Sequence, residues 1–168
     1  ASPIVVEGND FNVGLFTTDG QLVTAGIGSL VYVGTMAKTV QSIIARAGHI
    51  RPGDVFMTND PFLGALHQND LVLASPLYRD GEIILWVGNV LHHPDVGGID
   101  EGSFCINARN LYQDPPRYFL KIVDQGEMVT EVEYTFVTNS RLPDMVALDL
   151  RAQIGAIHVA KQRLDELL

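Results

Sequence analysis

The chain of 168 residues carries 20 acidic and 11 basic side chains, a formal net charge of −9 at pH 7. Hydrophobic residues make up 46% and charged residues 18%, so disorder is excluded and one domain with a real core is expected. The acidic balance argues against nucleic acid as a partner, and no apolar run reaches the ~18–20 residues that cross a membrane. The single cysteine, Cys105, excludes an internal disulfide and favours a reducing, cytoplasmic compartment.

The first third of the chain predicts a hairpin followed by a helix. Short strands are expected over residues 4–6 and 12–17, and Asp19-Gly20 is a turn from which residues 21–25 return. A helix is predicted over residues 34–47, because apolar residues recur there at three- and four-residue spacing and form one stripe. The members of this stripe are Met36, Val40, Ile43, Ile44 and Ala47.

The middle of the chain predicts the centre of a sheet. Residues 54–58 form an expected strand that ends before Pro61, because proline donates no hydrogen bond to a neighbouring strand. Residues 71–78 and 82–91 are strongly apolar, and Arg79-Asp80-Gly81 between them has the composition of a hairpin loop. This pattern predicts an antiparallel hairpin, 71–78 with 82–91, inside a larger sheet.

The last part of the chain combines a long loop with helices. Residues 92–116 are rich in Gly, Pro, Asp and Asn and predict a loop, and a strand is expected over 117–123. Residues 127–139 fit a helix or a strand, and a long helix is predicted from Pro143 onward. Together these elements predict a mixed α/β (α+β) fold with an antiparallel or mixed sheet and flanking helices.

Two histidines and one carboxylate flank the ends of the predicted hairpin. His67 and Asp70 precede its first strand, and His92 follows its second strand. The start of one antiparallel strand lies beside the end of its partner, so these side chains would converge at one edge of the sheet. Such a set suits a divalent transition metal with open positions for water or substrate. The competing interpretation is that these residues only cap turns.

Other reactive motifs are absent from the sequence. Gly26-Ile27-Gly28 does not complete a dinucleotide fingerprint, and no glycine-rich phosphate loop occurs. No Gly-x-Ser-x-Gly elbow supports acyl transfer by serine. Cys105 lacks the surroundings of a nucleophile, so a structural thiol is expected.

Four ordered motifs make the chain resemble the hydantoinase B/oxoprolinase family, which includes the alpha subunit of acetone carboxylase. They span nearly the whole sequence and comprise residues 19–23, 59–70, 87–98, and 139–143 with 149–153. Members of that family are several times longer, and the chain begins with Ala1 rather than with methionine. Residues 1–168 are therefore expected to form a single metal-binding domain excised from a larger subunit. The resemblance also favours a helix over 127–139.

The resemblance implies a metal site formed by His67, Asp70 and His92, with His92 preferred to its neighbour His93. The cation would be zinc, manganese or iron. His93 and Asp95 become tentative catalytic groups that support the ligands or carry protons, with loop structure as the alternative.

The resemblance further implies ATP and Mg²⁺ bound by a partner, an actin-like hydantoinase A/oxoprolinase-type or carboxylase beta subunit, so that this chain is inactive alone. The partner would phosphorylate a carbonyl or amide oxygen, and the activated substrate would react at the metal site. The run from His67 to Asp70 resembles ketone carboxylases more than hydantoinases (including N-methylhydantoinases) or oxoprolinases. A non-catalytic structural module and a small-molecule-binding module, neither of which binds metal, stay open as alternatives.

Overall fold

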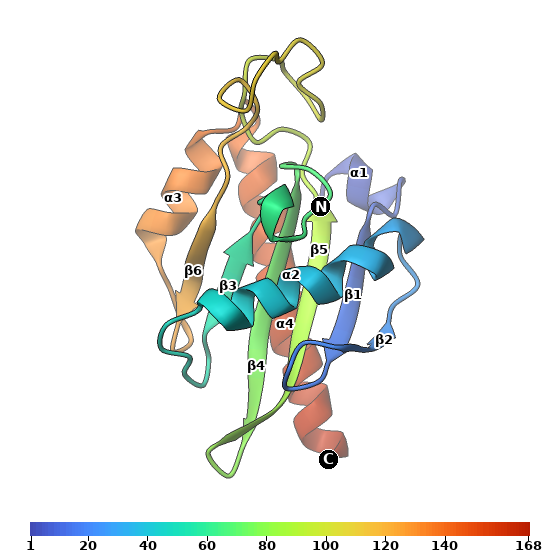
Figure 1. Ribbon diagram of the computed structural model, residues 1–168, viewed down its shortest axis with the longest axis vertical. Helices are drawn as coiled ribbons and strands as arrows, with labels where there is room; N and C mark the ends of the chain where they lie inside the picture. The colour runs from blue at the N-terminus through green and yellow to red at the C-terminus, as the bar shows by residue number, and fades with distance from the viewer.

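The computed structural model describes residues 1–168 and contains one antiparallel sheet of seven strands in the order β2-β1-β5-β4-β3-β6-β7 (Figure 1). The strands are β1 (Phe11–Phe16), β2 (Leu22–Ala25), β3 (Val55–Thr58), β4 (Asp70–Arg79), β5 (Glu82–His92), β6 (Phe119–Asp124) and β7 (Glu127–Met128). The helices are α1 (Pro3–Val6), α2 (Val33–Arg46), α3 (Thr130–Thr138) and α4 (Pro143–Leu167), with 3-10 turns η1 (Leu30–Tyr32) and η2 (Pro61–Leu63). The predicted mixed α/β class is confirmed.

The central hairpin pairs β4 with β5 along their whole length. The register runs from Asp70 opposite His92 to Arg79 opposite Glu82. Asp80 and Gly81 both have positive φ, 50° and 84°, as a two-residue type I′ turn requires. The predicted hairpin is therefore confirmed, and the two strands lie near the middle of the sheet.

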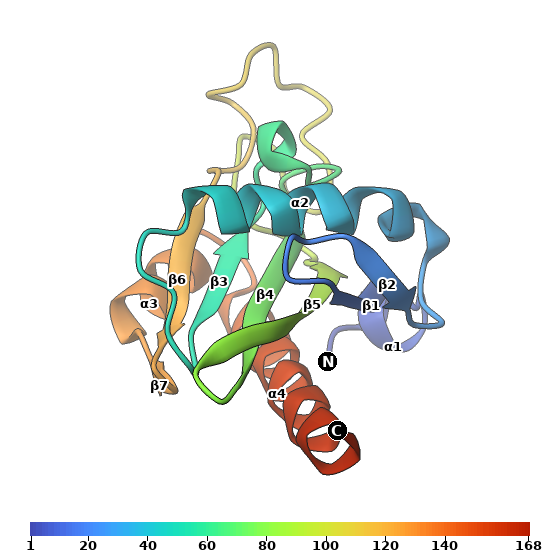
Figure 2. The same cartoon turned by 60° about the horizontal axis from the view of Figure 1, so that its bottom comes forward.

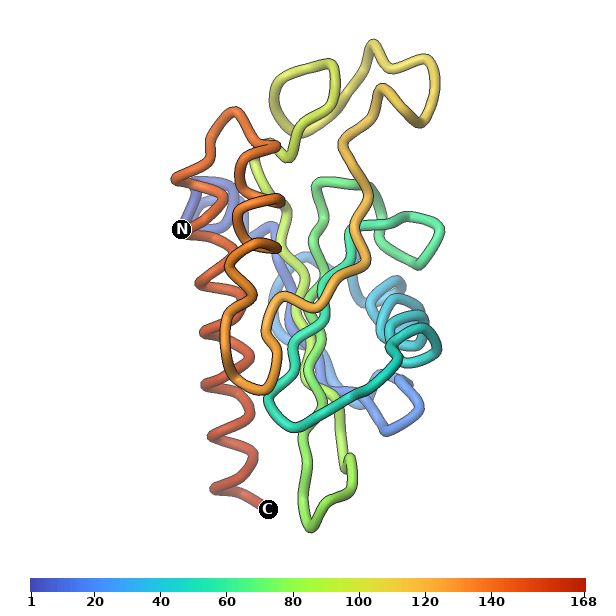
Figure 3. Tube along the Cα trace, turned by 90° about the vertical axis from the view of Figure 1, so that its left-hand side faces the viewer, coloured from blue at the N-terminus to red at the C-terminus, as the bar shows by residue number.

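Helices cover both faces of the sheet. Figures 2 and 3 show α2 across one face, with α3 and α4 on the other. The α2 stripe buries Met36, Val40 and Ile43 against Phe16 and Trp86. On the opposite face, α4 buries an apolar stripe of Val146, Leu150 and Ile157, together with Phe136 of α3. Burial of these two apolar stripes is the main contribution to the fold.

Two short segments adopt conformations that the sequence pattern did not define. The strand over residues 4–6 is wrong, because Pro3 at the first helical position starts the short helix α1, in which the Glu7 N–H donates to the Pro3 carbonyl. The ambiguous segment 127–139 divides into the short strand β7 and the helix α3, so the helix that the resemblance favours is present over 130–138. None of the helices combines the length and the apolar character required of a membrane span.

Candidate metal centre

The register of the central hairpin positions the candidate site. Asp70 begins β4 and lies directly opposite His92, the last residue of β5. His67 precedes β4 in a turn in which the Asp70 N–H donates to the His67 carbonyl over 3.0 Å. This turn brings the side chains of His67 and Asp70 together. Three side chains from two chain segments therefore meet at the same end of the central strand pair.

The three predicted ligands form one cluster. One donor atom from each of His67, Asp70 and His92 lies within 4.8 Å of the other two. The His92 Nδ1 atom is 2.9 Å from Asp70 Oδ1, and the His67 Nε2 atom is 3.3 Å from Asp70 Oδ2. The structure thus brings together the residues that the hairpin argument selected.

Two further polar residues adjoin the cluster and were not predicted. Asp10 directly precedes β1, which pairs with β5, and its Oδ2 atom lies 3.9 Å from His92 Nδ1. The Tyr32 hydroxyl, at the end of η1, is 2.8 Å from Asp10 Oδ1 and 3.1 Å from Asp70 Oδ1. Both residues reach the site through contacts that are distant in sequence, and no local motif marks them.

The cluster is rich in negative charge. Asp70 is 1% exposed and pairs with no lysine or arginine, and its Oδ2 atom has no hydrogen-bond donor. Burial lowers the pKa of His67, against the opposing effect of Asp70. Burial and the nearby carboxylates of Asp70 and Asp10 raise the pKa of Tyr32, so its hydroxyl keeps its proton. A buried carboxylate oxygen without a donor is costly, and a divalent cation would balance the negative charge of Asp70 and Asp10.

A small pocket opens beside the cluster. Its volume is about 360 Å³, and its apolar wall consists mainly of Ile4, Val31, Leu66 and Phe104. The Phe104 ring stacks on the His67 ring, with 4.9 Å between centroids and a 22° interplanar angle. Phe104 belongs to the long loop before β6, which projects beyond the sheet in Figure 1. A larger groove of about 480 Å³ around Lys161 contains no comparable cluster of donors.

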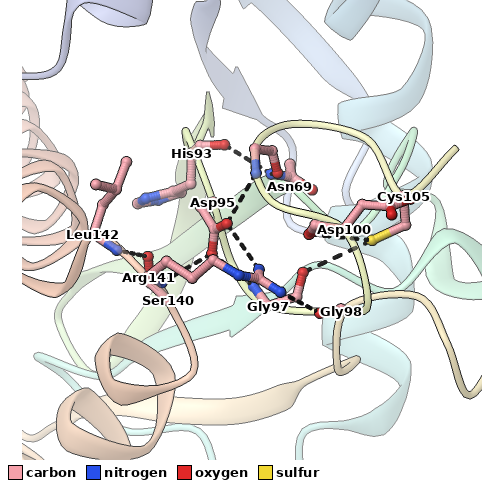
Figure 4. Close-up of polar contacts among 11 residues, drawn as sticks. Asn69, His93, Asp95, Gly97, Gly98, Asp100, Cys105, Ser140, Arg141 and Leu142 are labelled. Atoms are coloured by element: carbon pink, nitrogen blue, oxygen red, sulfur yellow. Dashed lines mark hydrogen bonds and ion pairs between the residues drawn. The ribbon is translucent and has the colours of Figure 1, made fainter. Parts of the chain in front are cut away.

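His93 and Asp95 do not line that pocket. Figure 4 shows Asp95 directed toward Arg141. Because successive strand residues face opposite sides, His93 points toward α4, where its Nε2–H donates to Gln153 Oε1 over 3.0 Å. Asp95 accepts hydrogen bonds from the backbone N–H groups of Gly97, Gly102 and Arg141 and from the Arg141 guanidinium. The Asp95–Arg141 pair thereby ties the start of the long loop to the junction of α3 and α4.

We expect the burial of His93 to make the stability of the folded protein depend on pH. Burial lowers its pKa to about 4, whereas an unfolded histidine titrates near 6.5. Between these values the unfolded chain binds more protons, so stability falls as pH drops from about 6.5 to about 4, by roughly 3 kcal/mol. Urea unfolding with a chelator present, at pH 7 and pH 4.5, measures this loss. His93→Gln should remove most of it, and an equal loss in this variant would contradict the assignment.

The fold and the site together define an α+β domain with a candidate mononuclear metal centre. The chain belongs to the hydantoinase B/oxoprolinase family, whose sequence model matches residues 1–168. It is 35% identical over 162 residues to a 5-oxoprolinase of Dictyostelium discoideum and 33% identical over 173 residues to the acetone carboxylase alpha subunit of Xanthobacter autotrophicus. These matches cover 95% and 100% of this chain, respectively.

A solved structure shares the fold. It is the nucleotide-free structure of an acetone carboxylase, an enzyme of ATP-dependent acetone carboxylation. It matches 99% of this chain with a TM-score of 0.92 and 25% identity. The chain spans 13% of the 5-oxoprolinase, 22% of the alpha subunit and 22% of the solved chain. The family resemblance read from the four motifs is confirmed.

Proposed function

We propose that this chain is the metal-binding catalytic segment of an ATP-dependent enzyme that acts on a phosphate-activated carbonyl substrate. His67, Asp70 and His92 would hold zinc, manganese or iron. The observation that carries the proposal is the convergence of their donor atoms within 4.8 Å of one another, at a buried aspartate whose Oδ2 atom has no hydrogen-bond donor.

The spacing of the donor atoms supports a shared cation. Two ligands bonded at ~2.1 Å to one ion lie about 3.0–3.4 Å apart in tetrahedral or octahedral geometry. His92 Nδ1 lies 2.9 Å from Asp70 Oδ1, a distance that also fits a hydrogen bond, and His67 Nε2 lies 3.3 Å from the other carboxylate oxygen, Oδ2. Turn capping, the competing interpretation, does not account for three donor groups within 4.8 Å of one another.

The surrounding residues suit chemistry at a carbonyl group. A bound divalent cation supplies a Lewis acid that stabilises negative charge on a substrate oxygen. The apolar wall of Ile4, Val31, Leu66 and Phe104 favours a small organic substrate. Asp10, 37% exposed at the side chain, adds a second carboxylate at the rim of the pocket.

ATP would be bound by another subunit or domain. This chain has no phosphate-binding loop or dinucleotide fingerprint, while the acetone carboxylase structure is described as ATP-dependent and one relative is named an alpha subunit. We therefore propose an actin-like ATP-binding partner that activates the substrate, and a cytoplasmic complex in accordance with the single thiol.

The substrate class separates two reactions. The acetone carboxylase relatives favour a ketone, whose activated enolate would be carboxylated, and the 5-oxoprolinase relative favours water attack on an activated cyclic amide. The run from His67 to Asp70 leads us to prefer the ketone. ATP hydrolysis by the complete enzyme should then require both a ketone and bicarbonate. Hydrolysis driven by a lactam without bicarbonate would instead establish the amide reaction.

Metal analysis of single variants tests the site. His92→Ala should remove bound metal from the full-length complex, because it deletes one of three ligands, whereas His158→Ala should retain it, because His158 is exposed on α4. Element analysis after dialysis measures the stoichiometry. The proposal would be contradicted if the wild-type protein bound no metal after reconstitution with Zn²⁺, Mn²⁺ or Fe²⁺. It would also be contradicted if both variants lost bound metal equally.

A further inference from the structure

We infer that Tyr32 is a positioning residue of the candidate metal centre, whose hydroxyl fixes the carboxylates of Asp10 and Asp70 in the orientation that a cation requires. This inference rests on the function proposed above. It concerns a residue that contributes no ligand atom and that no sequence motif identified.

The tyrosine reaches the cluster from the hydrophobic core. Tyr32 is 2% exposed, and its ring packs in the core layer between α2 and the sheet, with Met36 and Val90 among the members. Its hydroxyl lies 2.8 Å from Asp10 Oδ1 and 3.1 Å from Asp70 Oδ1. A ring fixed by core packing has a rigid tip, so the hydroxyl is a fixed reference point for two carboxylates from different segments.

The contact decides which Asp70 oxygen faces which histidine. Asp70 Oδ1 lies beside both the Tyr32 hydroxyl and His92 Nδ1, and Oδ2 is directed to His67. Without the hydroxyl, only the two histidines would restrain the terminal torsion of the carboxylate, which is broad. Outer partners of this kind set the orientation of metal ligands.

The hydrogen count also points to a cation. A phenol carries one hydrogen, so Tyr32 donates to only one of the two carboxylates at a time. In the other of the two contacts, the Tyr32 oxygen then faces a carboxylate oxygen with no hydrogen between them. A divalent cation bound by the carboxylates would offset this repulsion, which explains why such an arrangement suits a metal centre better than a structural network.

The replacement of Tyr32 by phenylalanine tests this role. Phenylalanine keeps the buried ring and removes only the hydroxyl, so the fold should persist. In the full-length protein, Co²⁺ and Zn²⁺ affinity, measured by competition with a chelator, should fall about 10- to 100-fold. The visible absorption bands of bound Co²⁺ should also shift, because the carboxylate orientation changes.

Tyr78→Phe is the matched control. The Tyr78 hydroxyl donates to the Ile50 carbonyl over 3.0 Å, remote from the cluster. This variant should lose a hydrogen bond of similar kind while it keeps wild-type metal affinity and Co²⁺ spectrum. Metal-free melting temperatures of the two variants should be similar, which separates a loss of positioning from a loss of stability.

Asp10→Asn, alone and combined with Tyr32→Phe, tests the coupling. If the hydroxyl acts through the carboxylates, the two losses in affinity should be less than additive. Strictly additive losses, or wild-type affinity in Tyr32→Phe, would overturn the inference and leave the proposed metal centre intact. Absence of metal binding in the wild-type protein would instead overturn the proposed function itself.

Discussion

Asp70→Asn should abolish metal binding while leaving the metal-free protein at least as stable as the wild type. The loss in metal affinity should exceed the roughly 10- to 100-fold that removal of an outer partner costs, because an anionic ligand becomes a neutral amide. The free energy of unfolding of the metal-free protein should rise by about 1–2 kcal/mol, as often happens when a functional charge is removed.

The reason is the environment of the two Asp70 oxygens. Oδ1 lies beside the Tyr32 hydroxyl and His92 Nδ1, and an asparagine oxygen keeps these contacts. Oδ2 is buried, has no donor and lies 3.3 Å from His67 Nε2. An asparagine N–H in that place can donate to the His67 Nε2 atom. The variant thus makes a hydrogen bond where the native Oδ2 atom has none.

Asp54→Asn provides a matched control. Asp54 is also fully buried, but it pairs with Lys121 over 2.8 Å and accepts backbone hydrogen bonds from Arg51 and Gln125. Its replacement should lower stability by about 3 kcal/mol, as the loss of a buried paired charge does, without effect on metal affinity. Amide hydrogen exchange of β3 to β5 in the full-length protein, with chelator present, measures both variants. A destabilised Asp70→Asn protein would indicate a structural carboxylate instead of a ligand.

Gly64→Ala should destabilise the protein strongly and weaken metal binding at the same time. Gly64 has φ of 118°, and a Cβ atom built there lies 2.8 Å from the Thr39 backbone nitrogen and from its Oγ1 atom. The close approach seats the segment before His67 against α2, so alanine must both strain the backbone and displace that segment. We expect a loss of at least about 3 kcal/mol.

Gly81→Ala separates strain from contact. Gly81 has φ of 84° in the hairpin turn, but nothing lies within 4 Å of a Cβ atom there. Its replacement should cost only about 1–2 kcal/mol of left-handed backbone strain and leave metal affinity unchanged. Exchange of the β4 and β5 amides gives the stability, and chelator competition gives the affinity. Equal effects of the two substitutions would show that the contact with α2 does not support the His67 turn.

The centre of the site was predictable because its determinants are local. A tight turn at Asp80-Gly81 and two apolar runs define the hairpin, and antiparallel pairing then places His92 opposite Asp70. Asp10 and Tyr32 were not predictable in this way. They join the site through the pairing of β1 with β5 and the packing of α2, contacts that no periodicity in one segment reveals.

The conformation of short elements was also not predictable from the sequence. Residues 4–6 show no clear hydrophobic periodicity, and Pro3 at the first helical position determined their conformation. His93 and Asp95 have the residue types of catalytic groups, but the side-chain directions after the end of β5 and the hydrogen bonds of the loop are tertiary properties. His93 consequently contacts Gln153, and Asp95 contacts Arg141, where the sequence offered only their proximity to His92.

The central hairpin has its donor residues at one end and its turn at the other. Strand β4 has ten residues from Asp70 to Arg79 inclusive, which gives a span of about 30 Å at ~3.3 Å per residue step. Extra residues inserted between Arg79 and Glu82 would lengthen the turn without changing the pairing of Asp70 with His92. A single deletion inside either strand would shift that pairing and turn alternate side chains to the other face. The turn is therefore the place for an epitope tag or a reporter domain, and length variation among natural variants of this segment should concentrate there.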